Sequence, residues 1–122
     1  MNIQDVNGPS VVLLVRNEKE AVNYYTDLGF KFESVGGHAH VSLGKVTLIL
    51  HQAQNPDEIK PFSSASGGLY FDVFCYTSQL KELHELFITK GVPVVNGPFW
   101  GEGWSEFTIK DLNGYCIAFG GK

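Results

Sequence analysis

Two histidines separated by one residue, His38 and His40, are the first side chains along the chain whose type and spacing could do chemistry. They lie in an alternating segment, and residues two apart on a strand share one face. Two imidazoles on one face could bind a divalent metal ion or hydrogen-bond an anionic or phenolic ligand. The alternative is a solvent-exposed strand beside the turn at Gly36-Gly37, where polar residues are expected. His51 follows an apolar run and is either a further metal ligand or a surface residue at a strand end.

A glycine-rich aromatic loop over residues 96–104 is the second candidate site. Its two tryptophans, Trp100 and Trp104, could form a mobile wall that stacks on a planar ligand. We expect at least one of them at a ligand site, and the alternative is that both close the core. Two nearby carboxylates, Glu102 and Glu106, would favour a cationic ligand, and the net charge of -4 acts in the same direction.

A segment over residues 69–75 supplies the third group of candidates. It predicts a strand, and one face of that strand would carry Tyr70, Asp72, Phe74 and Tyr76. Two or three of these side chains should line the ligand site, with Asp72 as either a ligand contact or an exposed charge at the sheet edge. His84 follows a helical pattern among charged residues and is expected in solvent.

Composition places the chain among ordinary globular proteins. Its 122 residues are 43% hydrophobic and 18% charged, enough for one core and too few for two independent ones. Lys and Arg are scattered, which argues against a nucleic-acid interface. No apolar run approaches the roughly 20 residues of a membrane span, and residues 1–5 lack the pattern of a signal peptide. A cytoplasmic location without membrane contact is therefore expected.

The two cysteines, Cys75 and Cys116, each lie within an apolar strand pattern. Buried thiols in a reducing compartment more often pack in the core than form a disulfide. No electropositive residue adjoins either thiol in the sequence to activate it as a nucleophile. We expect both cysteines to be core residues.

The elements that must position the candidate residues repeat along the chain. Strand-like residues 11–15 lead into a helical pattern at 18–27, and residues 69–75 lead into another at 80–89. The ends of the two helical patterns lie about sixty residues apart, which indicates two copies of one supersecondary unit.

The predicted architecture is a single α+β domain over residues 1–122, built from tandem βαβββ modules that form curled mixed sheets. Module one spans residues 9–52 and module two spans residues 68–120. Residues 53–67 between them are polar and contain prolines, which is typical of a surface linker. Further strands are predicted over residues 30–33, 38–43, 46–50, 92–95, 105–109 and 115–119.

Local signals predict where the two helices begin and end. Asn17 is a good N-cap with Glu20 three residues later, and Gly29 ends the first helix as a left-handed cap. The second helix has Thr77 or Ser78 as its N-cap candidate.

Several short motifs occur in an order that resembles a known superfamily. The opening motifs are Pro9, Val15-Arg16-Asn17, Ala21, Tyr24-Tyr25 and Leu28-Gly29-Phe30, and the closing motifs are Trp100-Gly101, Glu106-Phe107 and Asp111-Leu112-Asn113-Gly114. Their order and the duplication resemble the vicinal oxygen chelate superfamily, which includes glyoxalase I, extradiol dioxygenases and bleomycin-resistance proteins. The ending is similar to the bleomycin-resistance branch, except that Ser105 stands where that branch has an arginine. Serine cannot replace a bidentate guanidinium, so the ligand need not be the branch's usual one.

The resemblance implies that each curled sheet forms a cup, with small molecules bound inside it or at the seam of a homodimer. Catalytic members hold one divalent metal ion with residues near the start of each module's first strand and a glutamate near the end of each last strand. The comparable positions here are Ser10, Tyr70, Leu48 and Ala118. None of these is a good metal ligand, so the resemblance favours the non-catalytic binding branch.

The leading prediction is a bleomycin-resistance-like homodimer without a cofactor, which sequesters a planar aromatic or cationic small molecule. Its expected ligand-binding residues are His38, His40, Tyr70, Asp72, Phe74, Trp100, Glu102, Trp104 and Glu106. The alternative is a lyase, isomerase or dioxygenase of the same superfamily that holds one divalent metal ion through His38, His40 or His51 with Glu106. A protein-interaction module without a small-molecule pocket is the third hypothesis.

Overall fold

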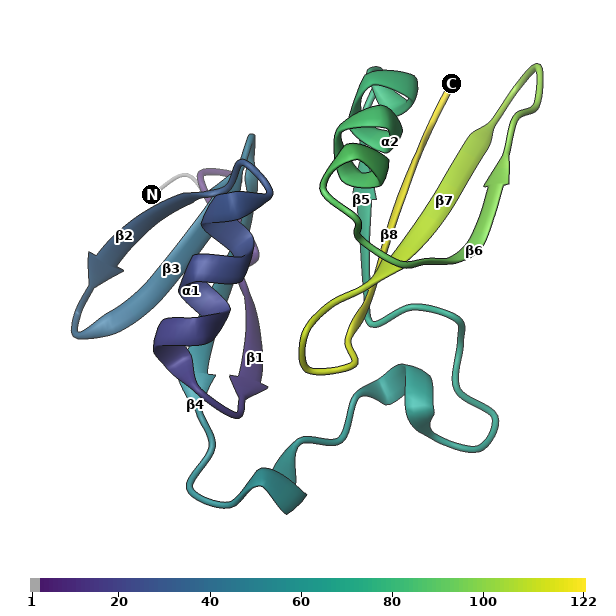
Figure 1. Cartoon of the computed structure of the whole chain (residues 1–122). Coiled ribbons are helices and arrows are strands. Elements are labelled where there is room, and N and C mark those ends of the chain that lie inside the picture. Colours follow the sequence, from purple (N-terminus) through teal and green to yellow (C-terminus); the bar gives the residue numbers. More distant parts are fainter. Residues whose placement is uncertain (1–2) are drawn as a thin grey trace. The chain divides into compact units, whose positions relative to one another are not determined.

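The computed structural model describes residues 3–122. The chain divides into two compact units, Met1–Ala53 and Gln54–Lys122. In each unit a single α-helix lies against one four-stranded sheet (Figure 1). The element order is βαβββ in each unit, as the sequence predicts, and the fold class is α+β.

The first unit contains β1 (Val11–Val15), α1 (Glu18–Asp27), β2 (Lys31–Val35), β3 (His38–Leu43) and β4 (Val46–Gln52). Its sheet has the order β1-β4-β3-β2, with β1 parallel to β4 and the other neighbours antiparallel. Because β1 and β2 lie at opposite edges of the sheet, the chain must cross one face between them, and α1 makes that crossing.

Local sequence accounts for both ends of α1. The Asn17 side chain accepts a hydrogen bond from the Glu20 backbone N–H at 2.9 Å, which confirms the predicted N-cap. Gly29 has a φ of 101°, a conformation that favours glycine, and it ends the helix as predicted. Ala21 and Tyr25 are buried on the face of α1 that packs on the sheet.

Side-chain alternation separates the core of the first unit from its other face. Leu13 and Val15 of β1, Val41 of β3, and Leu48 and Leu50 of β4 are buried. Leu13 pairs with Leu50 and Val41 pairs with Leu48, while Val15 lies two residues after Leu13 on the same face of β1, so these side chains form one layer beneath α1. The residues between them in sequence point to the opposite side of the sheet.

The second unit begins with two short 3-10 helices, η1 (Pro56–Glu58) and η2 (Phe62–Ser64), within the predicted linker. The repeat follows as β5 (Val73–Tyr76), α2 (Leu80–Thr89), β6 (Val94–Phe99), β7 (Ser105–Lys110) and β8 (Cys116–Gly121). The strand order, β5-β8-β7-β6, reproduces that of the first unit, and β5 is parallel to β8.

An aromatic trio forms the centre of the second core. The ring of Phe87 on α2 lies 6.1 Å from the ring of Phe107 and 5.4 Å from that of Phe119, and the two strand residues stack at 5.6 Å. All three side chains are buried. These contacts identify the face of the sheet that α2 covers.

Two strands differ from the sequence prediction. β5 begins only at Val73, and Asp72 before it directs its carboxylate to Ser63 and to the Cys116 backbone N–H. β6 continues through Asn96-Gly97-Pro98, which was predicted to be loop, with irregular pairing to β7. A side chain at Gly97 would lie 2.9 Å from the backbone oxygen of Glu106, so the two strands approach too closely for any other residue.

The start of α2 also differs from its prediction. Gln79, and neither Thr77 nor Ser78, is the N-cap residue, and its side chain makes no capping hydrogen bond. Thr77 still contributes, because its hydroxyl oxygen accepts a hydrogen bond from the Gln79 backbone N–H at 3.0 Å. Thr77 lies two residues before the N-cap position, so its hydroxyl serves the Gln79 N–H and not an N–H of the helix itself.

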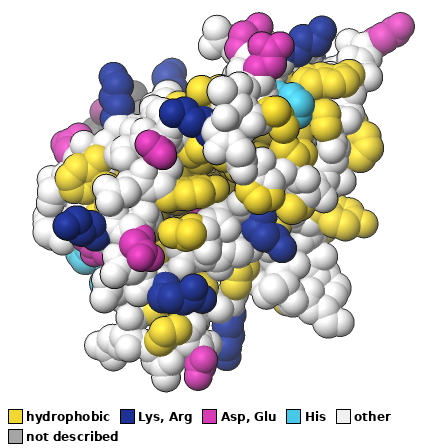
Figure 2. Space-filling view, in the orientation of Figure 1, with side chains coloured by type: hydrophobic (Ala, Val, Ile, Leu, Met, Phe, Trp, Pro, Cys, Tyr) yellow, Lys and Arg dark blue, Asp and Glu magenta, His cyan; other side chains and the backbone are white. Residues whose placement is uncertain are grey.

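Both cysteines are buried with free thiols, and burial raises the pKa of the Cys75 thiol to about 11. Across residues 3–122, neither α-helix has the length and apolar character to cross a membrane. In Figure 2, Lys and Arg side chains are spread among acidic and hydrophobic ones on the face in view.

Candidate functional site

The face of the second sheet opposite α2, which we call the open face, carries most of the aromatic candidates. Phe107 and Phe119 face α2, so the residues that alternate with them on β7 and β8 point the other way. The register places Glu106 opposite Gly120, and Gly120 opposite Tyr76 on β5. These three residues therefore form one row across three strands.

Four side chains on and beside the open face, Phe71, Phe74, Tyr76 and Trp104, form what we call the aromatic cluster. Phe74 is at its centre, with ring centroids 5.2 Å from Phe71 and 5.2 Å from Tyr76. Trp104 stacks on Phe74 at 6.2 Å with an interplanar angle of 22°, and its edge meets Tyr76 at 6.2 Å. Trp104 remains 39% exposed and Tyr76 76% exposed, so the cluster presents ring surface to solvent.

Gly120 provides the space that the aromatic cluster occupies. A Cβ atom at this position would lie 2.6 Å from Cζ2 of Trp104 and 2.8 Å from Cζ of Phe74. Both distances are shorter than van der Waals contact, so the two rings can lie on the strand only because this residue has no side chain.

Glu106 brings a carboxylate to the edge of the aromatic cluster. It lies directly opposite Gly120, and such cross-strand neighbours have Cβ positions roughly 5 Å apart. Glu106 thus occupies the cross-strand position beside Gly120, and Trp104 lies over Gly120. The side chain is half-buried, and among residues 3–122 its carboxylate has no hydrogen bond or ion pair. The open face thus combines stacked rings with a free negative charge.

The structure separates the two tryptophans of the loop. Trp100 lies on the α2 side, with its ring 5.6 Å from His84, and lines a small pocket of about 240 Å³ at the start of α2. His84 is half-buried between Trp100 and Phe107, so the expectation that it lies in solvent was wrong. Glu102 is exposed at the loop between the two tryptophans. Only Trp104 joins the aromatic cluster.

Asp72 has a structural contact that the sequence pattern did not reveal. Its carboxylate accepts hydrogen bonds from the Ser63 backbone N–H at 2.8 Å, the Ser63 hydroxyl at 2.6 Å and the Cys116 backbone N–H at 2.8 Å. Both oxygens are occupied, so Asp72 is neither an exposed edge charge nor a free ligand contact. Tyr70 precedes β5 and is 76% exposed. The predicted common strand face is limited to Phe74 and Tyr76.

The open face of the first sheet gathers the histidines. His38, His40 and Ser42 share one face of β3, as predicted, and they point away from the buried layer under α1. The ring centroids of His38 and His51 lie 5.6 Å apart across β3 and β4. Nδ1 of His40 donates a hydrogen bond to the backbone oxygen of His38 at 3.2 Å, since a carbonyl can only accept. The Ser42 hydroxyl is paired with that of Thr47 at 2.9 Å.

The metal-ligand positions implied by the superfamily resemblance do not fit a metal ion. Leu48 is fully buried under α1. The residue of the first unit that is equivalent to Ala118 is Ile49, on the open face, because each of the two pairs with the second residue of the first strand in its own unit. Neither hydrocarbon side chain can donate to a metal. Ser10 and Tyr70 both lie outside the strands. Among the described residues, no group of three or more His, Cys, Asp or Glu side chains converges to hold a metal ion.

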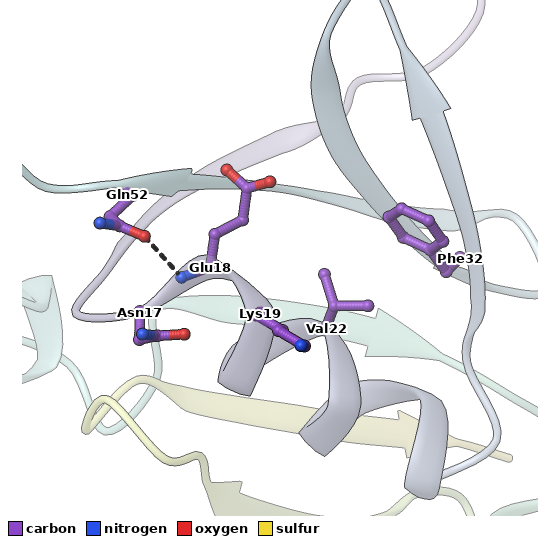
Figure 3. Close-up of a pocket in the computed structure, with 6 residues that line it drawn as sticks. All are labelled: Asn17, Glu18, Lys19, Val22, Phe32 and Gln52. Carbon is purple, nitrogen blue, oxygen red and sulfur yellow. Dashed lines mark hydrogen bonds between the residues drawn. The ribbon is translucent and has the colours of Figure 1, made fainter.

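A pocket of about 530 Å³ beside α1 was not predicted from the sequence. Figure 3 shows its six lining residues: Asn17, Glu18, Lys19, Val22, Phe32 and Gln52. The Gln52 side chain accepts a hydrogen bond from the Glu18 backbone N–H at 3.0 Å, which ties the end of β4 to the start of α1. Two backbone N–H groups at the start of α1, those of Glu18 and Glu20, are therefore already hydrogen-bonded to the side chains of Gln52 and Asn17.

Sequence reasoning missed two residues of the aromatic site, Phe71 and Gly120. Phe71 falls between the alternate residues that were assigned to one strand face, and it contacts Phe74 from a position before the start of β5. The sequence did contain a signal for Gly120, because a glycine inside an apolar strand often marks a place where another group approaches the backbone closely.

Solved structures share this fold. No protein-family model and no curated protein matches the sequence. An integron cassette protein from the mobile metagenome of V. Cholerae is 23% identical, with a TM-score of 0.68 and 96% of each chain covered. A putative glyoxalase family protein from Bacillus anthracis is 19% identical, with a TM-score of 0.69 and 96% of each chain covered. A glyoxalase family protein from Bacillus cereus is 14% identical, with a TM-score of 0.68, over 95% of this chain and 93% of that one.

These similarities establish the fold class of the chain. Two copies of a βαβββ unit, each with a four-stranded mixed sheet and one helix, form the glyoxalase fold. At identities below 25% the likeness extends to the fold and not to an activity.

Proposed function

We propose that this protein binds a planar, cationic aromatic molecule on the open face of its second sheet and sequesters it without metal catalysis. The observation that supports the proposal best is the stacked pair of Trp104 and Phe74 above Gly120, with Glu106 at the cross-strand position opposite that glycine. In this proposal the protein acts like the bleomycin-resistance branch of the vicinal oxygen chelate superfamily, as a cytoplasmic homodimer.

The chemistry of the open face suits this ligand class. An exposed indole face attracts a cation by about 0.5–2 kcal/mol, and a planar ring adds stacking. The Glu106 carboxylate lacks a partner among the described residues, so a cationic ligand would neutralise it at no cost to another contact. An anionic aromatic would meet repulsion at the same place.

The metal-dependent enzyme is the weaker candidate. The superfamily positions carry Ile49 and Ala118 on the open faces, and hydrocarbon side chains cannot hold or activate a divalent ion. Asp72, the one carboxylate near the start of β5, already accepts three hydrogen bonds. The side chains at these positions therefore favour ligand binding over metal catalysis.

A fluorescence titration with a planar cationic dye of the acridinium class tests this function. Trp100→Phe leaves Trp104 as the single tryptophan, and we expect saturable quenching with an affinity within about twofold of the original. Trp104→Phe, the matched variant, should retain Trp100 emission without saturable quenching and lose binding at least tenfold, which is about 1.4 kcal/mol.

Two further arms separate the alternatives. An aromatic dye of similar size with a sulfonate group should bind at least tenfold more weakly, because Glu106 repels it. Addition of EDTA should leave cationic dye binding unchanged. Saturable quenching that persists in Trp104→Phe, where Trp100 is the single tryptophan, would overturn the proposal, and so would dye binding that EDTA abolishes. The absence of any dye binding would favour the protein-interaction module.

A further inference from the structure

We propose that His38 and His51 form an exchangeable two-histidine site for a divalent transition-metal ion on the open face of the first sheet. The site uses residues of the first unit, whereas the aromatic cluster belongs to the second unit, and it does not depend on the ligand proposed for that cluster. It would hold zinc or a neighbouring ion of the first transition series, with solvent completing the coordination.

The strand register brings the two imidazoles together. Ala39 of β3 pairs with Leu50 of β4, and the next residues outward on these antiparallel strands are His38 and His51. The side chains of both histidines point away from the layer buried under α1, and both are exposed to solvent. A cation could therefore reach them directly.

The distance between the rings is close to that needed for a shared ion. Zinc–nitrogen bonds are about 2.0–2.1 Å, so two imidazoles on one tetrahedral ion have centroids roughly 5 Å apart. The His38 and His51 centroids lie 5.6 Å apart with an interplanar angle of 39°. The centroid separation is therefore compatible with one ion shared by both rings once side-chain rotation directs a nitrogen of each ring toward it.

The donor type selects the class of ion. Neutral imidazole nitrogens suit zinc, nickel and copper, whereas magnesium and calcium prefer oxygen ligands. Residues 3–122 contain no convergent group of three or more such side chains, so two protein ligands are what the site offers. Structural and catalytic zinc sites use four and three protein ligands, and a two-ligand site is expected to bind more weakly and exchange its ion.

The neighbouring histidine supplies a matched control. His40 lies on the same face of β3, but its Nδ1 is used in the hydrogen bond to the His38 backbone oxygen. Its cross-strand neighbour on β4 is Ile49, which has no donor atom. Replacement of His40 removes one imidazole from the same face without removing either member of the pair.

Calorimetric titration of the untagged, chelator-stripped full chain with zinc tests the assignment. We expect one ion per chain, and at least a tenfold weaker affinity in His38→Gln and in His51→Gln. His40→Gln should bind zinc within about twofold of the original chain. Magnesium at the same concentration should give no binding, and the NMR signals of the His38 and His51 rings should shift with zinc.

Two results would overturn the assignment. One is zinc affinity unchanged in His38→Gln or in His51→Gln, and the other is an equal loss in His40→Gln. Circular dichroism of each variant confirms that the fold persists. Because the acridinium titration reports on Trp104 in the other unit, failure of the zinc site and failure of the proposed function are distinguished by separate measurements.

Discussion

Gly120 shows at the scale of one residue how a missing side chain shapes the proposed binding surface. The equivalent position in the first unit, by strand register, is His51. There the same place on the sheet presents an imidazole, whereas at Gly120 the indole of Trp104 lies down on the strand. One position thus carries different chemistry in the two units.

Gly120→Ala should therefore disrupt the aromatic site. The added methyl group would overlap both Trp104 and Phe74, so we expect the indole to be displaced, with about 1–3 kcal/mol lost from the free energy of unfolding. Acridinium affinity should fall at least tenfold, measured by Trp104 quenching, and urea unfolding measures the stability.

Gly103→Ala is the matched control for this substitution. It lies next to Trp104 in sequence, but a Cβ atom there would contact nothing within 4 Å. Its dye affinity and stability should match the original chain. If Gly120→Ala bound the dye equally well, Trp104 would not need its place over the strand.

At the scale of elements, local signals decided how well the sequence predicted the structure. The ends of α1 were correct because Asn17 and Gly29 act on residues three or four away. The start of β5 and the role of Asp72 were wrong, because the Asp72 carboxylate accepts hydrogen bonds from Ser63 and Cys116, contacts that a local alternation pattern does not encode. A one-residue error in the register of β4 assigned Leu48, and not Ile49, to the position comparable to a metal ligand. Since successive strand residues point to opposite faces, this put a residue buried under α1 in place of one on the open face.

The candidate site was predictable in composition but not in arrangement. The aromatic loop was identified, yet nothing local assigns Trp104 to the open face and Trp100 to the side of α2. Their difference follows from the path of the loop and from the close approach at Gly120, and both depend on the finished sheet.

Asn17→Ala tests the local cap at the start of α1. The substitution removes the side-chain acceptor for the Glu20 N–H, so we expect about 1 kcal/mol lower stability of the first unit, measured by urea unfolding followed by circular dichroism. Asn23→Ala, at an exposed position within the same helix, should leave stability unchanged or slightly raised. A larger loss from Asn23→Ala would show that the cap is not what stabilises this end.

At the scale of the whole molecule, the buried thiol of Cys75 couples unfolding to pH. Its pKa is about 11 in the folded chain, against 9.0 for the free group. The folded state favours the protonated thiol, so this contribution is complete below pH 9 and is lost as the pH rises towards 11. Each unit of pKa difference corresponds to about 1.4 kcal/mol.

Denaturant unfolding between pH 8 and pH 11 checks this linkage. Cys75→Ala should lower stability at pH 8 through the smaller side chain but decline less steeply with pH than the original chain. Cys116→Ala, which keeps Cys75, should retain the steeper decline. Parallel curves for all three proteins would contradict the assignment to Cys75.

The alternation of side chains on the two sheets has an evolutionary consequence. The residues that hold each helix, such as Leu50 and Phe119, and the residues that offer ligand chemistry, such as His51 and Gly120, occupy successive positions along β4 and β8. A substitution at His51 or Gly120 therefore changes a side chain on the open face and replaces none in the hydrophobic layer beneath the helix. After a duplication, one copy could acquire imidazoles and the other an indole and a carboxylate, while both kept the same backbone.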